Sequence, residues 1–295
     1  MKWVILVLIY GLLKGIRDIS KKKAMEVNSL MEVLFVYTLL AFIFVIPDVR
    51  NAGGVAPIDL GLTAVKSFVI FVAFICGFYA IEKMPIGIYG IVDLSRMLFS
   101  LVLGVIILDE RLGLFQYIGI GLVLLGLILL KYRPRFLKKT VKVNEDEAEP
   151  SKTGKISGLV LLIAFVSTFL NAVSGIMDKI LMKTMTSSQL QFWYMLFMVV
   201  YYGLYVLISR TKIHWKSVLK NIHVWLIAVL FIVADRCLFI ANGDPTSKVT
   251  VMTILKQICV VVTIIGGRII YKEKEMGYKI FCALIVVAGI VFSAL

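Results

Sequence analysis

The sequence predicts an all-α integral membrane protein in which ten transmembrane helices form two inverted five-helix repeats. First, 60% of the 295 residues are hydrophobic and the mean hydropathy is +0.97, whereas a soluble domain has roughly 45–50% apolar residues. Second, the apolar residues gather in runs of about 20, the length of a helix that crosses the hydrocarbon core. Third, the chain matches itself in order on either side of a polar segment at residues 132–155.

The first repeat is expected to comprise residues 1–131. Each of its apolar runs is predicted to be helical, because an isolated helix satisfies its own backbone hydrogen bonds in lipid. The third run is the least regular of the five, since Lys66 lies near its start. The predicted spans are residues 2–20, 29–47, 62–82, 86–108 and 113–131.

Residues 132–155 form the one long polar segment of the chain. From Lys131 they read KYRPRFLKKTVKVNEDEAEPSKTGK, a basic block followed by an acidic block with few apolar residues. Such a composition cannot build a packed core and is typical of a flexible linker. We therefore place the boundary between the two halves here and expect the linker to be cytoplasmic.

The second, inverted repeat is expected to comprise residues 156–295, again with five apolar runs. The predicted spans are residues 156–180, 188–209, 222–242, 246–270 and 277–295. The cysteines of the chain, Cys76, Cys237, Cys259 and Cys282, all fall inside apolar runs without metal-ligand spacing. We interpret them as small buried hydrophobic residues and predict neither a metal site nor a cofactor.

The two halves match residue by residue. At an offset of 160 the pairs are Gly15 and Gly175, Asp18 and Asp178, Pro85 and Pro245, and Arg96 and Lys256. Beyond Arg268 the offset becomes 163, with the pairs Glu110 and Glu273, Val123 and Val286, and Gly126 and Gly289. Because each half has an odd number of spans, the second copy is predicted to cross the membrane upside down. Inverted repeats are frequent in transporters, which bind cargo at the midplane between them.

The formal charge of +14 lies mostly in loops between spans. Under the positive-inside rule, the loop charges favour a cytoplasmic linker and put both termini outside. We expect a multi-pass protein of the cell (inner or plasma) membrane. Its basic loops would contact anionic lipids rather than nucleic acid. The sequence leaves a monomer and a homodimer open.

Two basic residues lie near the middle of predicted spans, Arg96 in the fourth and Lys256 in the ninth. Each has a polar residue three positions earlier on the same helix face, Asp93 and Thr253 respectively. A charge at bilayer depth costs several kcal/mol, roughly 3 on insertion scales, unless it faces protein or water. Two such charges at matching places predict a central polar cavity, and hence a transporter.

Further polar residues recur with helical spacing on other spans and are candidates for the same cavity. These candidate substrate-binding residues are Tyr89 on the fourth span, Lys14 and Arg17 on the first, Asn171 and Ser174 on the sixth, and Asp235 and Arg236 on the eighth. Basic residues exceed acidic ones among the deep charges. The excess favours a small anionic cargo, because Arg offers a bidentate fork to a carboxylate or a phosphate and Lys a point charge.

The segment SRMLFSLVLGVIILDERLGLFQYIGIGLVLLGLILL from Ser95 resembles the fourth and fifth helices of the drug/metabolite transporter (DMT) superfamily, EamA-like ten-helix branch. The turn Leu108-Asp109-Glu110 matches that family's turn. The second half repeats the pattern as IIYKEKEMGYKIFCALIVVAGIVF from Ile269, with Glu273 at the turn. The resemblance implies a ten-helix fold and a transport function. The family often has a proline near the positions of Arg96 and Met97, so its known substrates do not transfer to this chain.

Several alternatives stay open at this stage. The deep charges could be structural pairs, with Asp93 neutralising Arg96, or Asp93 could carry a proton in an exporter of amino acids or amines. A flippase for a lipid-linked or polyprenyl-phosphate envelope intermediate and a non-transporting partner subunit are further possibilities. An enzyme is not predicted, because the sequence lacks the HExxH and Gly-x-Ser-x-Gly motifs and has no His among the deep polar residues.

Overall fold

The computed structural model of the protein describes residues 2–83, 86–131, 157–259, 262 and 276–294. For some residues within helices, among them Tyr89 and Asp93, it describes the backbone alone. Throughout the described ranges the regular structure is helical and no strand occurs. This agrees with the all-α class expected from the apolar runs.

The first half of the chain contains α1 (Lys2–Met25), α2 (Leu30–Val45), the short 3-10 helix η1 (Ile46–Asn51), α3 (Pro57–Lys83), α4 (Ile86–Leu108) and α5 (Leu114–Lys131). The second half contains α6 (Gly158–Leu181), α7 (Ser187–Ser209), α8 (Trp215–Lys220), α9 (Ile222–Gly243), α10 (Val249–Leu255) and α12 (Met276–Ala294). The predicted ninth span begins with α10. Its part beyond Cys259 lies outside the described residues apart from Val262.

Local sequence signals explain where several helices begin and end. Thr186 begins α7 through a capping box, in which its hydroxyl accepts from the backbone of Gln189 at 3.2 Å and Gln189 accepts from the backbone of Thr186 at 2.8 Å. Asn221 caps α9 through the His223 amide at 3.1 Å. At the other end of α7, Arg210 takes a left-handed conformation and stops the helix.

By length and composition, a subset of the described helices is long and apolar enough to cross a membrane. These segments are Leu30–Asn51, Pro57–Gly77, Gly158–Leu181, Ser187–Ser209 and Ile222–Gly243, five in all among the described residues. Shorter apolar helices occupy Ser95–Leu108, Leu114–Gly126 and Phe281–Phe292. Helix α1 is not in this set; it carries Lys14, Arg17 and further charged residues near its end. The count of ten spans stays a prediction.

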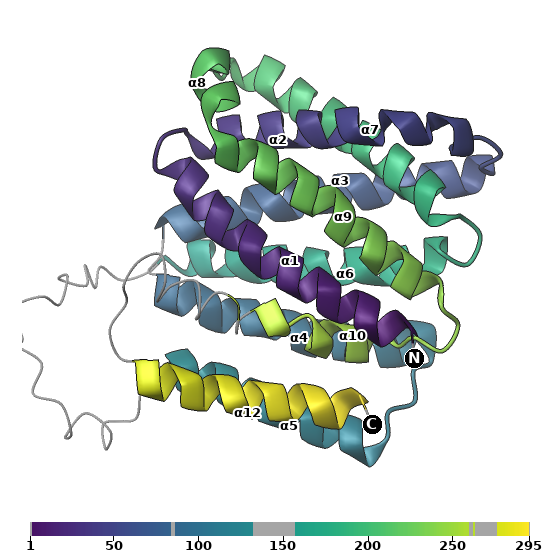
Figure 1. Ribbon diagram of the computed structural model, residues 1–295, viewed down its shortest axis with the longest axis vertical. Helices are drawn as coiled ribbons and strands as arrows, with labels where there is room; N and C mark the ends of the chain where they lie inside the picture. The colour runs from purple at the N-terminus through teal and green to yellow at the C-terminus, as the bar shows by residue number, and fades with distance from the viewer. Residues whose placement is uncertain (1, 84–85, 132–156, 260–261, 263–275, 295) are drawn as a thin grey trace, which may run out of the picture.

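Both chain termini lie at one end of the helix bundle, which we call the terminal end (Figure 1). Helix α5 finishes and α6 starts at the opposite end, which we call the linker end (Figure 1). Helix α1 therefore runs from the terminal end to the linker end. Its last turns, with Lys21 and Met25, lie at the linker end.

The packing of the helices repeats when the two halves are exchanged. Helix α1 packs against α9 and α3 against α6, while α5 packs against α12 and α2 against α7. The α3 contact with α7 is likewise matched by the contact of α2 with α9. This pattern treats α1, α2, α3 and α5 as counterparts of α6, α7, α9 and α12.

The contact between α5 and α12 is close because a glycine lies on each side of it. A Cβ atom on Gly289 would meet the carbonyl oxygen of Gly119 and the amide of Val123 at 2.8 Å. A Cβ atom on Gly126 would meet a Val286 side-chain carbon at 2.8 Å and the Cys282 carbonyl at 3.1 Å. Small residues allow two helix backbones to approach in a membrane. Gly126 thus packs inside the protein, whereas Gly121 faces open space.

Candidate functional site

A cavity of about 420 Å³ lies inside the bundle, lined by residues of both halves of the chain. Helices α1, α3 and α4 supply side chains from the first half, and α6, α7, α9 and α10 supply them from the second. Met25, at the linker end of α1, lines the cavity and is 39% exposed. Every residue of α10 is buried, and Thr253 of this helix lines the cavity.

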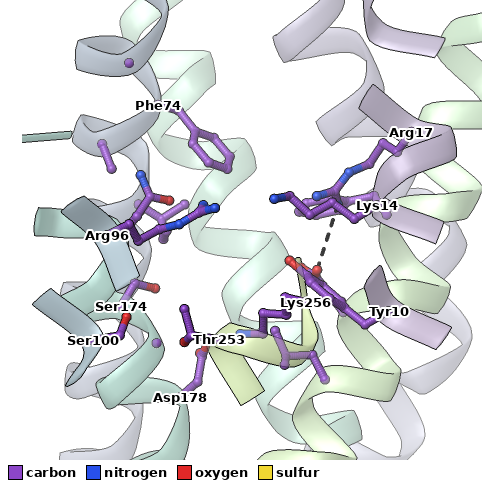
Figure 2. A pocket seen from close by; sticks show the side chains of 18 of the residues that line it. Tyr10, Lys14, Arg17, Phe74, Arg96, Ser100, Ser174, Asp178, Thr253 and Lys256 are labelled. Atoms are coloured by element: carbon purple, nitrogen blue, oxygen red, sulfur yellow. Dashed lines mark ion pairs between the residues drawn. The ribbon is translucent and has the colours of Figure 1, made fainter. Parts of the chain in front are cut away.

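Basic side chains outnumber acidic ones around the cavity. Of the lining residues that the structure describes, six are basic: Lys14, Arg17, Lys21, Lys66, Arg96 and Lys256. Two are acidic, Asp178 and Asp235. Arg96 from α4 and Lys14 from α1 extend toward each other from opposite sides of the space (Figure 2). An anion inside the cavity therefore meets cationic groups on two walls.

Between described side chains, Arg17 and Lys66 each pair with a carboxylate, and both pairs join the two halves of the chain. Lys66 Nζ on α3 lies 3.0 Å from Asp178 Oδ1 on α6, with side chains only 2% and 9% exposed. Lys66 also lies 3.3 Å above the ring of Tyr194. On the other side, Arg17 NH1 on α1 lies 4.0 Å from Asp235 Oδ1 on α9. Each contact brings opposite charges together inside the bundle, where neither charge could face lipid cheaply.

Lys256 has a different environment. It follows α10 as its C-terminal cap, and its Nζ lies 5.4 Å from the ring centroid of Tyr10 on α1. Among the described residues no carboxylate lies within ion-pair distance of this ammonium group. The face of the Tyr10 ring makes a cation–π contact with the ammonium group, and this contact uses none of the three N–H donors of Lys256 in a hydrogen bond. Lys256 is therefore available to an anion in the cavity.

Residues selected from the sequence divide into those that line the cavity and those that do not. Lys14, Arg17, Arg96, Asn171, Ser174, Asp235, Thr253 and Lys256 all line it. Within this set, the hydroxyl of Thr253 donates to the carbonyl of Val249 at 2.9 Å, and Asn171 donates to the carbonyl of Ser167 at 2.8 Å. Those groups are already engaged with backbone. The side chains of Tyr89 and Asp93 lie outside those the structure describes.

Arg236 is the selected residue that the structure places elsewhere. Its guanidinium binds Asp48 of η1 and the side chain of Gln191, and it donates to the hydroxyl of Ser188 at 2.6 Å. Consecutive residues on a helix point in different directions. When Asp235 faces the cavity, Arg236 therefore faces α7 and η1. Its role is to join helices at the terminal end, and it does not belong to the cavity lining.

Sequence reasoning missed several residues of the cavity wall. Lys66 counted only as an irregularity of the third span, whereas Asp178 shares the helical spacing of Asn171 and Ser174 on the sixth span and was expected to face the cavity with them. Their contact joins positions 112 apart in the chain, which no spacing pattern reveals. The aromatic residues Phe74, Tyr194, Phe231 and Phe239 also line the cavity, as does Tyr10, which shares the helical spacing of Lys14 and Arg17 on the first span. Tyr194 is therefore a buried lining residue and not the lipid-facing aromatic that its apolar run suggested. Aromatic residues are common in membrane helices, so their number alone gave no signal.

Glu110 has a partner that the sequence did not indicate. A carboxylate in the turn before a helix commonly caps that helix, which here is α5. Instead, its carboxylate accepts from the amides of Val249 and Thr250, the latter at 3.1 Å. The left-handed backbone of Asp109 turns the chain so that Glu110 faces the first turn of α10. A carboxylate there stabilises the helix start. Glu273, its counterpart, lies outside the described residues.

The family model of the EamA-like transporter family matches residues 1–132. This confirms the resemblance found from the segment that begins at Ser95, and the family belongs to the DMT superfamily. Together with the apolar helices, the match indicates an integral membrane protein and a membrane transporter of the DMT type.

The remaining comparisons concern the fold and the curated proteins. One crystal structure superposes on the chain with a TM-score of 0.71 at 12% sequence identity. The superposition covers 98% of this chain and 95% of that one. At this identity the likeness shows the fold alone. No match is found among the curated proteins.

Proposed function

We propose that this protein is a secondary-active transporter that moves a small anionic metabolite, bearing a carboxylate or a phosphate, through the cavity between its two halves. The excess of basic over acidic side chains among the described lining residues of the cavity is the observation that carries the proposal. A cationic cargo would meet repulsion from Arg96, Lys14 and Lys256. An anionic cargo receives charge-assisted hydrogen bonds, which are stronger than neutral ones.

Arg96 and Lys256 are the residues that we assign to the anionic group of the cargo. Lys256 has no carboxylate partner among the described residues, and Arg96 extends into the same space from another helix (Figure 2). Lys66 is less available, since Asp178 binds its ammonium group at 3.0 Å. The aromatic side chains around the cavity would contact the uncharged part of the cargo.

We further propose that residues 1–131 and 156–295 are inverted five-helix repeats that alternate the access of the cavity. The supporting observation is that helix contacts exchange with one another when the halves are exchanged. The two ion pairs, Arg17 with Asp235 and Lys66 with Asp178, both cross between the halves. Movement of one half against the other would change these contacts. Cargo that binds beside the two ion pairs could therefore change which side of the membrane the cavity opens to.

The proposed orientation places the linker end in the cytoplasm of the cell and both termini outside. It is tested by labelling single cysteines in a variant without native cysteines. Lys183→Cys lies in the turn between α6 and α7 at the terminal end, whereas Lys212→Cys lies at the linker end, and both positions are exposed. An impermeant thiol reagent added to intact cells should label position 183 alone. Labelling of position 212 alone would show that the orientation is the reverse of the one proposed.

The cargo class is tested by thermal stabilisation of the purified full-length protein with panels of carboxylates, phosphates, amines and lipid phosphates. We expect small anions to raise the unfolding temperature of the wild type. Arg96→Gln and Lys256→Gln should abolish this gain, whereas the matched control Arg236→Gln should keep it, because Arg236 lies outside the cavity. Stabilisation by amines alone would overturn the proposal, and stabilisation by lipid phosphates alone would replace the metabolite by a lipid-linked cargo.

A further inference from the structure

The connection between α7 and α9 gathers basic residues on the surface at the linker end. Four of them, Arg210, Lys212, Lys216 and Lys220, are exposed, and we call them the basic patch. The chain has no acidic residue between Asp178 and Asp235, so the patch has no counter-charge from its own segment. At the terminal end Asp48, Asp109 and Asp244 accompany Arg50, Arg111 and Lys248, whereas at the linker end the nearby Glu32 is buried and already binds His214.

Large apolar side chains border the basic patch on the outer surface of the helices. Leu207 is 75% exposed, Ile208 is 82% exposed and Ile222 is 71% exposed. Trp215 and Leu219 on α8 are 44% and 41% exposed. A bilayer has the same arrangement, since its apolar acyl chains lie next to the headgroup level, where Trp side chains are enriched. The segment therefore matches the boundary between acyl chains and headgroups.

Helix α8 is fixed to the body of the protein, which holds the patch in place. Val218 is fully buried, and the ring of Trp215 packs edge-on against Phe35 with centroids 6.1 Å apart. The segment before α8 is held by Glu32, which accepts from the His214 backbone at 2.8 Å. The hydroxyl of Ser217 accepts from Asn28 at 2.8 Å. The lysines of α8 thus project from a rigid support.

We propose that the basic patch is a binding site for the headgroups of anionic phospholipids in the leaflet at the linker end. The charge is complementary, and the neighbouring exposed apolar residues would contact the acyl chains of the same lipids. Basic residues near a membrane surface each strengthen the attraction to anionic lipid about fivefold. The attraction falls off within about 8–10 Å at physiological salt, so residues on the opposite face of the membrane do not contribute.

The patch also has a direct connection to the cavity. Asn28, which holds α8, belongs to the turn after α1, and Asn221 donates to Asn28 Oδ1 at 3.1 Å and to the carbonyl of Ala24 at 3.3 Å. The neighbouring Met25 and Lys21 line the cavity. Lipid bound at the patch therefore steadies the end of α1 at the cavity rim. The lipid site itself does not depend on which cargo the cavity takes.

The test uses native mass spectrometry of the purified full-length protein in neutral detergent, titrated with phosphatidylglycerol or with phosphatidylcholine of the same acyl chains. The wild type should bind phosphatidylglycerol more tightly. The variant Lys212→Gln/Lys216→Gln/Lys220→Gln should weaken that binding more than tenfold and leave phosphatidylcholine binding unchanged. The matched control Lys2→Gln/Arg50→Gln/Lys183→Gln removes the same charge at exposed positions of the terminal end and should stay within twofold of wild type.

Three outcomes would overturn the proposal. In the first, the patch variant binds phosphatidylglycerol as tightly as the wild type. In the second, the control variant loses as much affinity, so that net charge alone is responsible. In the third, the wild type binds both lipids equally well. Because all the substituted residues are exposed, we expect both variants to unfold at the wild-type temperature, which is measured in the same samples.

Discussion

In the contact between α5 and α12 the two halves of the chain supply the same residues, whereas the charged residues that the structure describes around the cavity are divided unequally between the halves. Gly126 lies against Val286, and Gly289 lies against Val123. Because the repeat pairs Gly126 with Gly289 and Val123 with Val286, these two contacts are equivalent. Around the cavity, Lys14, Arg17, Lys21, Lys66 and Arg96 come from the first half. Both described acids, Asp178 and Asp235, come from the second half together with Lys256.

The α5–α12 contact and the cavity show that a duplicated sequence must meet two separate requirements, close helix packing and cargo recognition. Close helix packing depends on shape, and a shape that works in one half works equally in the other. Cargo recognition depends on the charge that remains after internal pairing, and a cavity with equal numbers of both signs would hold no net charge. Arg96 and Lys256 keep the same sign at matching positions, whereas Lys66 has an apolar residue, Leu226, at its matching position. The surplus of basic residues among the described lining residues therefore comes mainly from positions that differ between the halves, while the packing of α5 and α12 is symmetric.

The largest effect is expected from the buried ion pair at the cavity wall. Lys66→Met leaves the carboxylate of Asp178 buried without its partner, and such a loss costs about 3–5 kcal/mol of stability. The double variant Lys66→Met/Asp178→Leu removes both charges and should recover most of it. The measurement is the free energy of unfolding in mixed micelles. A single variant as stable as the wild type would show that the pair contributes nothing.

A smaller effect is expected where the packing is symmetric. Gly289→Ala places a methyl group 2.8 Å from the backbone of α5, and this overpacking should cost about 1–3 kcal/mol. Gly126→Ala should cost a similar amount, since its environment is the counterpart of the first. Gly121→Ala is the matched control, because nothing lies within 4 Å of its Cβ position. Unequal costs at positions 126 and 289 would break the symmetry inferred for this contact.

The smallest effect is expected from Thr253, which lines the cavity but already donates to the carbonyl of Val249. Thr253→Val keeps the shape of the side chain, and the hydroxyl is not available as a donor to the cargo. Cargo affinity measured by titration should change by less than about 1 kcal/mol, below the usual scale of a bond to a charged group. A larger loss would mean that the hydroxyl turns toward the cargo when it binds.

The sequence predicted the class of fold well, because apolar runs and their length follow directly from the need to satisfy the backbone in lipid. It also selected Arg96 and Lys256, since isolated charges in apolar runs stand out. It could not pair Lys66 with Asp178, because pairing depends on which helices are neighbours. Nor could it separate Asp235 from Arg236, since the direction that faces the cavity is set by the packing of α9 against α1 and α7.

The charge of the cavity is tested most directly by uptake of an identified anionic cargo into proteoliposomes that contain the purified protein. We predict that the double variant Arg96→Gln/Lys256→Gln takes up cargo at least 100-fold more slowly than the wild type at low cargo concentration. The reason is that each charge-assisted bond contributes about 1.5–3 kcal/mol. Arg236→Gln, which removes a charge outside the cavity, should retain uptake in the fraction that remains folded. Wild-type uptake by the double variant would contradict the assignment of the cavity cations to the cargo.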